Sequence, residues 1–246
     1  MNILDSISRR AEAGSKMLVR LIDPDKFDPS TLGDGFGGPA TNRQRGEGFD
    51  YYFVGGSTAS GTTAVVRAIH DASSTPVILF PGSPAQFTPE ADALLYLTLM
   101  NSRDPRFLID QQIETADAIV KSGIESIPMG YILVDGGRVS TTQRLTGAQP
   151  VSAENPDEAV RLARTAMLLG KRLIYLEAGS GANKPVPQSV IRAVKEAAHL
   201  PLIVGGGIRE PRQMTDAFVA GADIVVIGNH FETHPEQIPL FISNKD

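Results

Sequence analysis

The chain contains no cysteine and no long hydrophobic run. Without cysteine there can be no disulfide and no thiolate metal site, and such a composition suits a reducing cytoplasm, where we expect the protein to reside. Residues 1–14 lack the apolar core of a signal peptide. The longest apolar stretch, residues 93–100, has the length of a strand, and no run approaches the roughly 18 residues that a membrane helix needs. We therefore expect no stable membrane insertion.

A basic tract is also missing, and the net charge is −5. Nucleic acid is therefore not the expected partner. A phosphorylated ligand remains compatible, because local amides and a cation can hold phosphate on an acidic protein. The 246 residues, 41% of them hydrophobic and 21% charged, suit one soluble α/β barrel, and no linker divides them. We expect a single domain over residues 1–246.

Apolar runs of strand length recur along the chain, and amphipathic segments of helical length separate most of them. Near-continuous apolarity is typical of strands buried on both faces of a parallel sheet. Proline near the start of several helical segments suits the first helical turn. This alternation predicts an α/β fold, a (β/α)₈ TIM barrel, with a doubly wound open sheet as the alternative. The expected strands cover 17–23, 51–56, 76–82, 93–100, 124–134, 173–178, 201–206 and 223–228, and the expected helices cover 59–72, 106–122, 155–169, 187–198 and 211–220.

Two connections depart from this pattern. Residues 82–93 contain Pro84 and Pro89 and cannot hold a normal crossover helix. We therefore predict a barrel that lacks the helix after its third strand, which leaves a groove in the outer wall. The glycine-rich stretch 33–39 predicts a long loop where the first crossover helix should run.

The segment 175–182, Tyr-Leu-Glu-Ala-Gly-Ser-Gly-Ala, follows an apolar run and predicts a strand that ends in a loop of small residues. Glu177 and Tyr175 are two residues apart, so their side chains point to the same face of the strand. A carboxylate at a strand end, among amides and hydroxyls, can act as a general base on an alcohol. The alternative is a buried glutamate paired with Arg20 or Lys184.

Two further strand ends carry glycine, at 205–207 and at 228. Glycine costs chain entropy, so it needs a reason, and close approach of the backbone to a phosphate is one. In many barrels the phosphate site follows strands seven and eight, where these glycines fall. Tight turns are the alternative reading. The histidines show no spacing typical of metal ligands, and we expect surface or packing roles for His70, His199, His230 and His234.

The first two strands end in polar residues. Asp23 is a natural ligand for a hard cation such as Mg²⁺. The alternative is a cap or turn aspartate, a role that suits Asp25 better. The hydroxyls of Ser57 and Thr58 would complete a metal site or contact diphosphate; alternatively, one of them caps a helix that begins near Ala59.

Taken in order, several blocks of the chain resemble the geranylgeranylglyceryl phosphate synthases and their bacterial heptaprenylglyceryl phosphate relatives. The blocks span almost the whole expected barrel, and the combination is specific whereas no single block is. The resemblance implies a modified barrel without the helix after strand three, as expected above. The matching blocks are 21–26 (LIDPDK), 53–57 (FVGGS), 127–131 (IPMGY), 175–182 (YLEAGSGA), 204–209 (VGGGIR) and 228–229 (GN).

The resemblance also implies a Mg²⁺-dependent prenyl transfer in ether-lipid biosynthesis. The sn-3 hydroxyl of sn-glycerol 1-phosphate would attack C1 of a polyprenyl diphosphate, geranylgeranyl diphosphate being expected and heptaprenyl remaining open. Asp23 and Ser57 would hold the metal, and Glu177, with Tyr175, would act in catalysis. The prenyl tail would lie in the groove left by the missing helix. The implied glycerol 1-phosphate residues are Tyr175, Leu176, Glu177, Ala178, Gly179, Ser180, Gly181, Gly206, Gly207, Gly228 and Asn229.

The block 101–105 (NSRDP) resembles the larger-subunit branch of these synthases, which implies a homo-oligomer, either a dimer or a hexamer. Two other functions remain open. A phosphate-binding barrel that acts on a sugar phosphate would share the glycines, but it usually needs a lysine or an acid pair at strand ends. Lys171 and Lys184 are the only lysines that we expect nearby, and neither lies at a strand end. A non-catalytic prenyl- or phosphate-binding barrel would have no need of both Asp23 and Glu177.

Overall fold

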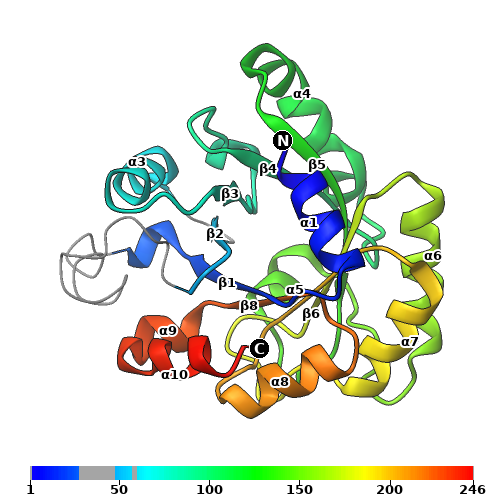
Figure 1. Cartoon of the computed structure of the whole chain (residues 1–246). Coiled ribbons are helices and arrows are strands. Elements are labelled where there is room, and N and C mark those ends of the chain that lie inside the picture. Colours follow the sequence, from blue (N-terminus) through cyan, green and yellow to red (C-terminus); the bar gives the residue numbers. More distant parts are fainter. Residues whose placement is uncertain (1, 28–47, 57–59, 246) are drawn as a thin grey trace.

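The computed structural model describes residues 2–27, 48–56 and 60–245, and they form a closed barrel of eight parallel strands (Figure 1). Strand β1 pairs with β8, with Val19 opposite Val226, which closes the ring. The barrel prediction is confirmed, and the open-sheet alternative is wrong. Each expected strand is present but shorter than its apolar run. The strands are β1 (Met17–Ile22), β2 (Tyr51–Val54), β3 (Val77–Leu79), β4 (Ala93–Leu99), β5 (Glu125–Leu133), β6 (Leu173–Glu177), β7 (Leu202–Gly205) and β8 (Ile224–Ile227).

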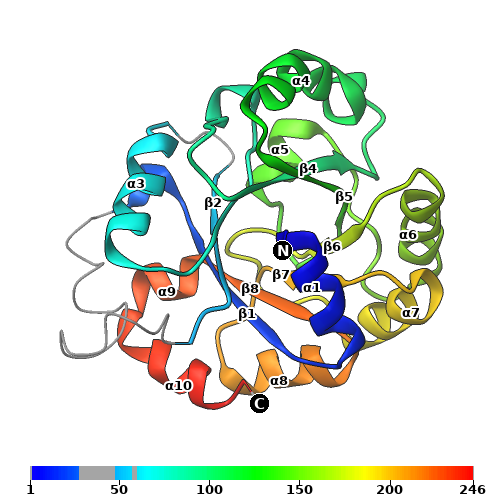
Figure 2. The ribbon, with the colours of Figure 1, turned by 45° about the horizontal axis from the view of Figure 1, so that its top comes forward.

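Helices cover the outside of the barrel (Figure 2). They are α3 (Thr62–Ala72), α4 (Gln111–Ser122) after a π-helical turn η4 (Arg106–Asp110), α6 (Asp157–Leu168), α7 (Gln188–Ala198) and α8 (Pro211–Val219). The expected helices are therefore confirmed, with one correction at a boundary. Helix α3 begins at Thr62, with Gly61 at its N-cap, and not near Ala59. Ser57 and Thr58 lie outside the described residues.

The connection between β3 and β4 carries only one 3₁₀ turn, η3 (Pro84–Gln86), so the predicted loss of a helix is confirmed. The side chain of Gln86 braces this connection against β2. Its amide donates to the carbonyl of Gly56 at 2.7 Å, and its carbonyl accepts from the amide of Gly82 at 3.0 Å. The predicted loop at 33–39 falls outside the described residues.

Several elements lie where no helix was predicted. Helix α1 (Ile3–Glu12) covers the amino-terminal end of the barrel, where Ile7 is fully buried against the inner side chains (Figure 2). Glu125 holds this helix by accepting from the amides of Ile3 at 2.6 Å and Leu4 at 2.8 Å. The other additions are η1 (Pro24–Lys26), α5 (Thr141–Thr146), α9 (Asn229–Thr233), η5 (Pro235–Gln237) and α10 (Ile238–Ser243).

Alternating side chains divide the apolar core into two layers. Val19, Phe53 and Tyr175 belong to the layer that fills the barrel, whereas Leu18 and Leu176 belong to the layer between strands and helices. This alternation follows from the period of two along a strand, and it directs Glu177, two residues after Tyr175, into the barrel.

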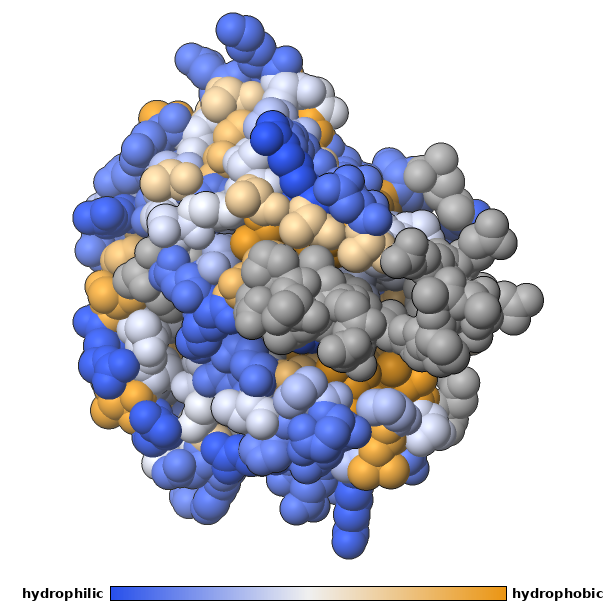
Figure 3. Space-filling view, turned by 90° about the vertical axis from the view of Figure 1, so that its left-hand side faces the viewer, coloured by the Kyte–Doolittle hydropathy of each residue, from blue (hydrophilic) through white to orange (hydrophobic). Residues whose placement is uncertain are grey.

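The surface is mixed in character. In Figure 3, hydrophilic side chains dominate the visible face and apolar patches lie between them. Over the part of the chain that is described, no helix has the length and apolarity required to cross a membrane.

Candidate active site

A cavity of about 540 Å³ opens at the carboxyl ends of the strands. This is the end at which barrel enzymes carry their active sites. Its lining comes from strand ends and loops all around the ring, so the fold brings together residues that are far apart in the sequence. The residues of the predicted site that line the cavity are Asp23, Tyr175, Glu177, Ser180, Gly181, Gly206, Gly207, Gly228 and Asn229.

Glu177 ends strand β6 and is 7% exposed. Its Oε1 accepts a hydrogen bond from the amide of Gly179 at 2.7 Å. Burial raises the pKa of Glu177 to about 6, against the smaller lowering effects of the Tyr175 hydroxyl and the Gly179 amide. No ion pair between described residues involves Glu177, so the alternative of pairing with Arg20 or Lys184 is wrong. A carboxylate with this pKa is ionised at neutral pH and can accept a proton.

The ring of Tyr175 lies beneath this carboxylate. It stacks on Phe80, with ring centroids 5.3 Å apart, and meets Tyr131 edge-on at 5.3 Å. Burial, with the charge of Glu177, raises the pKa of Tyr175 well above its ordinary value, so the hydroxyl stays protonated. That hydroxyl is buried, and its contact with Glu177 falls short of hydrogen-bond geometry; it has no hydrogen-bond partner among the described residues. A buried donor in this state is costly, and a ligand in the cavity would satisfy it.

Backbone amides form a second feature, which we call the amide cradle: the N–H groups of Ser180, Gly181, Gly206, Gly207, Gly228 and Asn229. All of these residues line the cavity, and within the described chain none of these amides donates a hydrogen bond to another residue. They follow strands β6, β7 and β8. Unused N–H groups at the wall of a cavity can form a concave site for an anion.

Backbone conformation also requires glycine at two positions of the amide cradle. Gly206 and Gly207 have φ of +81° and +73°, which L side chains rarely adopt. A Cβ at Gly206 would overlap the Glu177 carboxylate and lie 2.7 Å from the amide nitrogen of Gly179. The tight-turn reading of these glycines is therefore correct for the backbone, and it is compatible with the phosphate reading, because the same turns expose the amides.

Three residues of the predicted glycerol phosphate set, Leu176, Ala178 and Gly179, do not line the cavity. Leu176 and Ala178 pack in the outer layer, and the amide of Gly179 is bonded to Glu177. Two arginines that were not assigned to the site hold the same loop, and Arg209 also lines the cavity. Arg209 donates to the carbonyl of Ala182 at 2.7 Å, and Arg138 donates to that of Gly181 at 3.2 Å.

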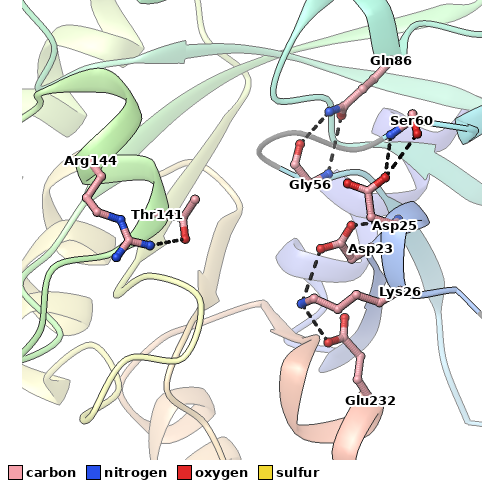
Figure 4. A network of polar contacts seen from close by, with 9 residues as sticks. All are labelled: Asp23, Asp25, Lys26, Gly56, Ser60, Gln86, Thr141, Arg144 and Glu232. Atoms are coloured by element: carbon pink, nitrogen blue, oxygen red, sulfur yellow. Dashed lines mark hydrogen bonds and ion pairs between the residues drawn. The ribbon is translucent and has the colours of Figure 1, made fainter.

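Asp23 lies across the cavity, at the end of β1 (Figure 4). Its carboxylate accepts from the amide of Asp25 at 3.2 Å, which caps turn η1, and lies 3.4 Å from the Nζ of Lys26. Asp25 instead accepts from the amide of Ser60 at 2.9 Å. The capping role expected for Asp25 thus belongs to Asp23. Ser57, the other predicted metal ligand, lies outside the described residues.

The lining also includes charged and aromatic side chains that the sequence reasoning did not assign. Lys26 and Glu232 line the cavity, and so do His230 and His234, whose rings stack at 4.9 Å. Lining the cavity does not contradict the surface or packing roles expected for these two histidines, and His230 does pack on Phe241. Lys26, in the turn after β1, is a lysine near the site that was overlooked. Their position in the chain could have revealed these residues, because Lys26 lies in the turn after β1 and His230 lies in the helix after β8.

A preformed metal cage is not evident. Within residues 2–27, 48–56 and 60–245, no three His, Asp or Glu side chains are grouped so that they could hold a metal ion. Asp23 would therefore need oxygens from a ligand or from water to complete a coordination shell.

Comparisons with known proteins place the chain in a family. A family model described as the PcrB family matches residues 17–243. The chain is 41% identical over 232 residues to the geranylgeranylglyceryl phosphate synthase of Zunongwangia profunda, covering 94% of this chain and 97% of that protein. It is 43% identical over 220 residues to the protein of the same name from Thermococcus gammatolerans, covering 88% of this chain and 84% of that one.

Solved structures give the same result. The crystal structure of (S)-3-O-geranylgeranylglyceryl phosphate synthase from Thermoplasma acidophilum, in complex with sn-glycerol-1-phosphate, superposes with a TM-score of 0.89 at 32% identity, covering 100% of this chain and 98% of that one. An N-acetylmannosamine-6-phosphate 2-epimerase from Clostridium perfringens, at 14% identity and a TM-score of 0.57, shares the fold alone.

Proposed function

This chain belongs to the PcrB family, and from that premise we propose how its cavity carries out the reaction. The protein is a prenyltransferase of ether-lipid biosynthesis: it forms an ether between the sn-3 hydroxyl of sn-glycerol 1-phosphate and a polyprenyl diphosphate, and it releases diphosphate. The observation that carries the proposed mechanism is the position of Glu177, a buried carboxylate beside the amide cradle. We propose geranylgeranyl diphosphate as the donor.

The amide cradle would bind the phosphate of the acceptor. Its amides supply oriented dipoles without net charge, and the family relative from Thermoplasma acidophilum binds sn-glycerol-1-phosphate. The glycerol would then extend toward Glu177 and the hydroxyl of Tyr175. Because that hydroxyl is a buried donor, it would hold the acceptor or the carboxylate in position.

Glu177 would act as the general base. The bond between the sn-3 oxygen and C1 of the prenyl chain forms, the bond between C1 and the diphosphate oxygen breaks, and the hydroxyl proton passes to Glu177. Its pKa of about 6 leaves the carboxylate ionised at neutral pH, yet a stronger base than an exposed glutamate. Burial also keeps bulk water from competing with the acceptor.

Asp23 fits a role as ligand of Mg²⁺. Its carboxylate lines the cavity and is a quarter exposed, and Mg²⁺ commonly takes one or two carboxylates together with phosphate oxygens and waters. When bound, the ion would neutralise charge on the departing diphosphate. We retain Ser57 as the proposed second ligand on the strength of the family resemblance alone.

The prenyl tail would follow the gap left by the missing helix. A small apolar groove of about 40 Å³ lies there between the β3–β4 connection and α4, and Leu97 lines both this groove and the main cavity. Its volume is close to that of one liquid water, roughly 30 Å³. The tail would therefore have to widen the groove by moving Phe87 or Ile119, which also line it.

We also propose a homo-oligomer, a dimer or a hexamer, in the cytoplasm. Ile113 and Val120 on α4 and Leu168 at the end of α6 are 66%, 82% and 81% exposed, and contact between copies would cover them. Light scattering after size exclusion tests this assembly directly, and a monomer at micromolar concentration would contradict it.

The test of function is product formation. The protein is incubated with Mg²⁺, sn-glycerol 1-phosphate and labelled geranyl, farnesyl, geranylgeranyl or heptaprenyl diphosphate, and the organic phase is assayed for the ether. We expect product with the highest yield from the geranylgeranyl donor. Absence of product with every donor would overturn the proposal, and a preference for the heptaprenyl donor would overturn the choice of chain length.

A further inference from the structure

Lys26 occupies the rim of the cavity between the first and last strands. Its Nζ lies 3.4 Å from Oδ2 of Asp23 and 3.1 Å from Oε2 of Glu232 (Figure 4). We call these three residues the charged rim. All of them line the cavity, and the side chain of Lys26 is 48% exposed. Turn η1 and helix α9 are thus joined by one ammonium group at the mouth of the site.

The two contacts of Lys26 are unequal. The contact with Glu232 has hydrogen-bond geometry, whereas the contact with Asp23 is an ion pair at longer range. Asp23 is already engaged with the amide of Asp25. An ammonium group has three N–H donors, and these two carboxylates engage at most two of them. Lys26 can therefore leave Asp23, keep Glu232, and still donate to a ligand in the cavity.

Charge favours such an exchange. The charged rim carries one net negative charge when its groups are ionised, so it would repel a diphosphate that approaches it. A divalent cation at Asp23 would meet the ammonium of Lys26 a few ångströms away, and like charges at that range repel strongly in a partly buried site. Both conflicts disappear if Lys26 moves from Asp23 to a diphosphate oxygen when the cation arrives.

We propose that Lys26 is a positioning residue for the diphosphate of the prenyl donor: it shields Asp23 in the unliganded protein and turns to the diphosphate when a divalent cation takes its place. This inference rests on the proposed function and adds a residue to it. Glu232 serves as the fixed partner that keeps Lys26 at the rim during the exchange.

The experiment measures binding without turnover. Isothermal titration calorimetry follows Mg²⁺ alone, inorganic diphosphate alone, and diphosphate with saturating Mg²⁺, for the wild type, Lys26→Met and Glu232→Gln. Lys121→Met is the matched control, because it removes one positive charge from an exposed position on α4. Thermal unfolding of each variant verifies that it is folded, and loss of a half-exposed ion pair should change it little.

For Lys26→Met we expect opposite changes with the two probes. Mg²⁺ alone should bind several-fold tighter because Asp23 loses its competing cation, and diphosphate with Mg²⁺ should bind about tenfold weaker. Glu232→Gln should weaken the binding of Mg²⁺ alone and strengthen that of diphosphate alone. If Lys26→Met matches Lys121→Met with both probes, or weakens both in parallel, the inference is wrong.

The same titrations separate this inference from the proposed function. sn-Glycerol 1-phosphate is the additional probe, and its affinity should change little in Lys26→Met, because the amide cradle consists of backbone amides and Lys26 pairs with the carboxylates of Asp23 and Glu232. A wild type that binds neither this acceptor nor Mg²⁺ with diphosphate would contradict the proposed function itself. A wild type that binds both, with an unchanged Lys26→Met variant, would contradict only the role of Lys26.

Discussion

The two sides of the cavity present charge to a ligand in different ways. The amide cradle, after β6, β7 and β8, offers backbone dipoles, and at Gly206 and Gly207 an added Cβ would collide with neighbouring groups. The charged rim, after β1 and β8, offers side chains that are partly exposed and held by ion pairs. One side is fixed by the backbone, and the other can rearrange.

This difference matches what each side would bind. A phosphate that stays on the product throughout needs a preorganised seat, and fixed dipoles cost no reorganisation. A diphosphate that departs with a cation needs groups that exchange partners. The charges of the rim are also screened by salt, because they are partly exposed.

Replacement of the proposed general base, Glu177, should have the largest effect on turnover. Glu177→Gln keeps the shape of the side chain and removes its ability to accept a proton, so kcat should fall by about 10²–10⁴-fold. The affinity for Mg²⁺ with diphosphate should stay close to that of the wild type, since the charged rim is unchanged. Steady-state kinetics with calorimetry measure both quantities. Glu196→Gln, at an exposed position on α7, is the control, and near-normal turnover in Glu177→Gln would refute the general base.

Replacement of the proposed metal ligand should affect the adjustable side. Asp23→Asn should abolish the response of activity to Mg²⁺ and remove several kcal/mol of transition-state stabilisation, at least about 100-fold in kcat/KM. A Mg²⁺ titration of initial rates measures the effect. Asp25→Asn is the matched control, because Asp25 contacts Ser60 and does not line the cavity. An unchanged metal dependence in Asp23→Asn would exclude the ligand role.

The fold could be predicted from the sequence because its signals are local. Most strands are near-continuous apolar runs, and Pro84 and Pro89 alone rule out a helix in their connection. Helix α1 could not be found in this way. Its partner is Glu125, more than a hundred residues away in the sequence, and the burial of Ile7 depends on a barrel end that exists only in the folded chain.

The same distinction applies to the site. The inward direction of Tyr175 and Glu177 follows from strand alternation and was predictable. The contact between Lys26 and Glu232 spans 206 positions, so no local pattern reveals it. The exchange of roles between Asp23 and Asp25 depends on which carboxylate faces the turn amide, a detail of backbone geometry that residue types do not encode.

A pair of glycines offers a matched test of the amide cradle. Gly206 and Gly170 have nearly equal φ, +81° and +78°, but a Cβ at Gly170 would meet nothing within 4 Å. Alanine at either position should cost about 1–2 kcal/mol of left-handed strain. Gly206→Ala should lower the free energy of unfolding by about 1–3 kcal/mol more than Gly170→Ala, because it displaces Glu177 and Gly179. It should also weaken sn-glycerol 1-phosphate binding about tenfold or more. Denaturant unfolding and calorimetry measure the two effects; equal behaviour of the variants would mean that the cradle tolerates the added methyl.

Stability should depend on pH through Glu177. Its pKa is raised in the folded state to about 6 from 4.5, so the folded protein binds the proton more tightly than the unfolded chain. The stabilisation that comes from this tighter proton binding is fully present below pH 4.5. It is lost as the pH rises through about 6, which lowers the free energy of unfolding by about 2 kcal/mol. Glu177→Gln lacks this titration, so the stability of the wild type relative to the variant should fall between pH 4.5 and pH 7. A constant difference, measured by urea unfolding across that range, would show that burial does not perturb the carboxyl.

The smallest effect concerns the pH profile of turnover. In the wild type, kcat/KM should rise about tenfold per pH unit below pH 6 and level off above it, as Glu177 ionises. The Tyr175 hydroxyl lowers the pKa of that carboxyl, so Tyr175→Phe should move the midpoint upward by a fraction of a unit. Tyr131→Phe serves as the matched control for losing a phenol, because Tyr131 lies beside Tyr175 but is not among the groups that shift the pKa of Glu177. If the midpoint of the pH profile is unchanged in Tyr175→Phe, the Tyr175 hydroxyl contacts the ligand and does not tune the Glu177 carboxyl. The fixed side of the cavity would then depend on Glu177 and the amide cradle alone.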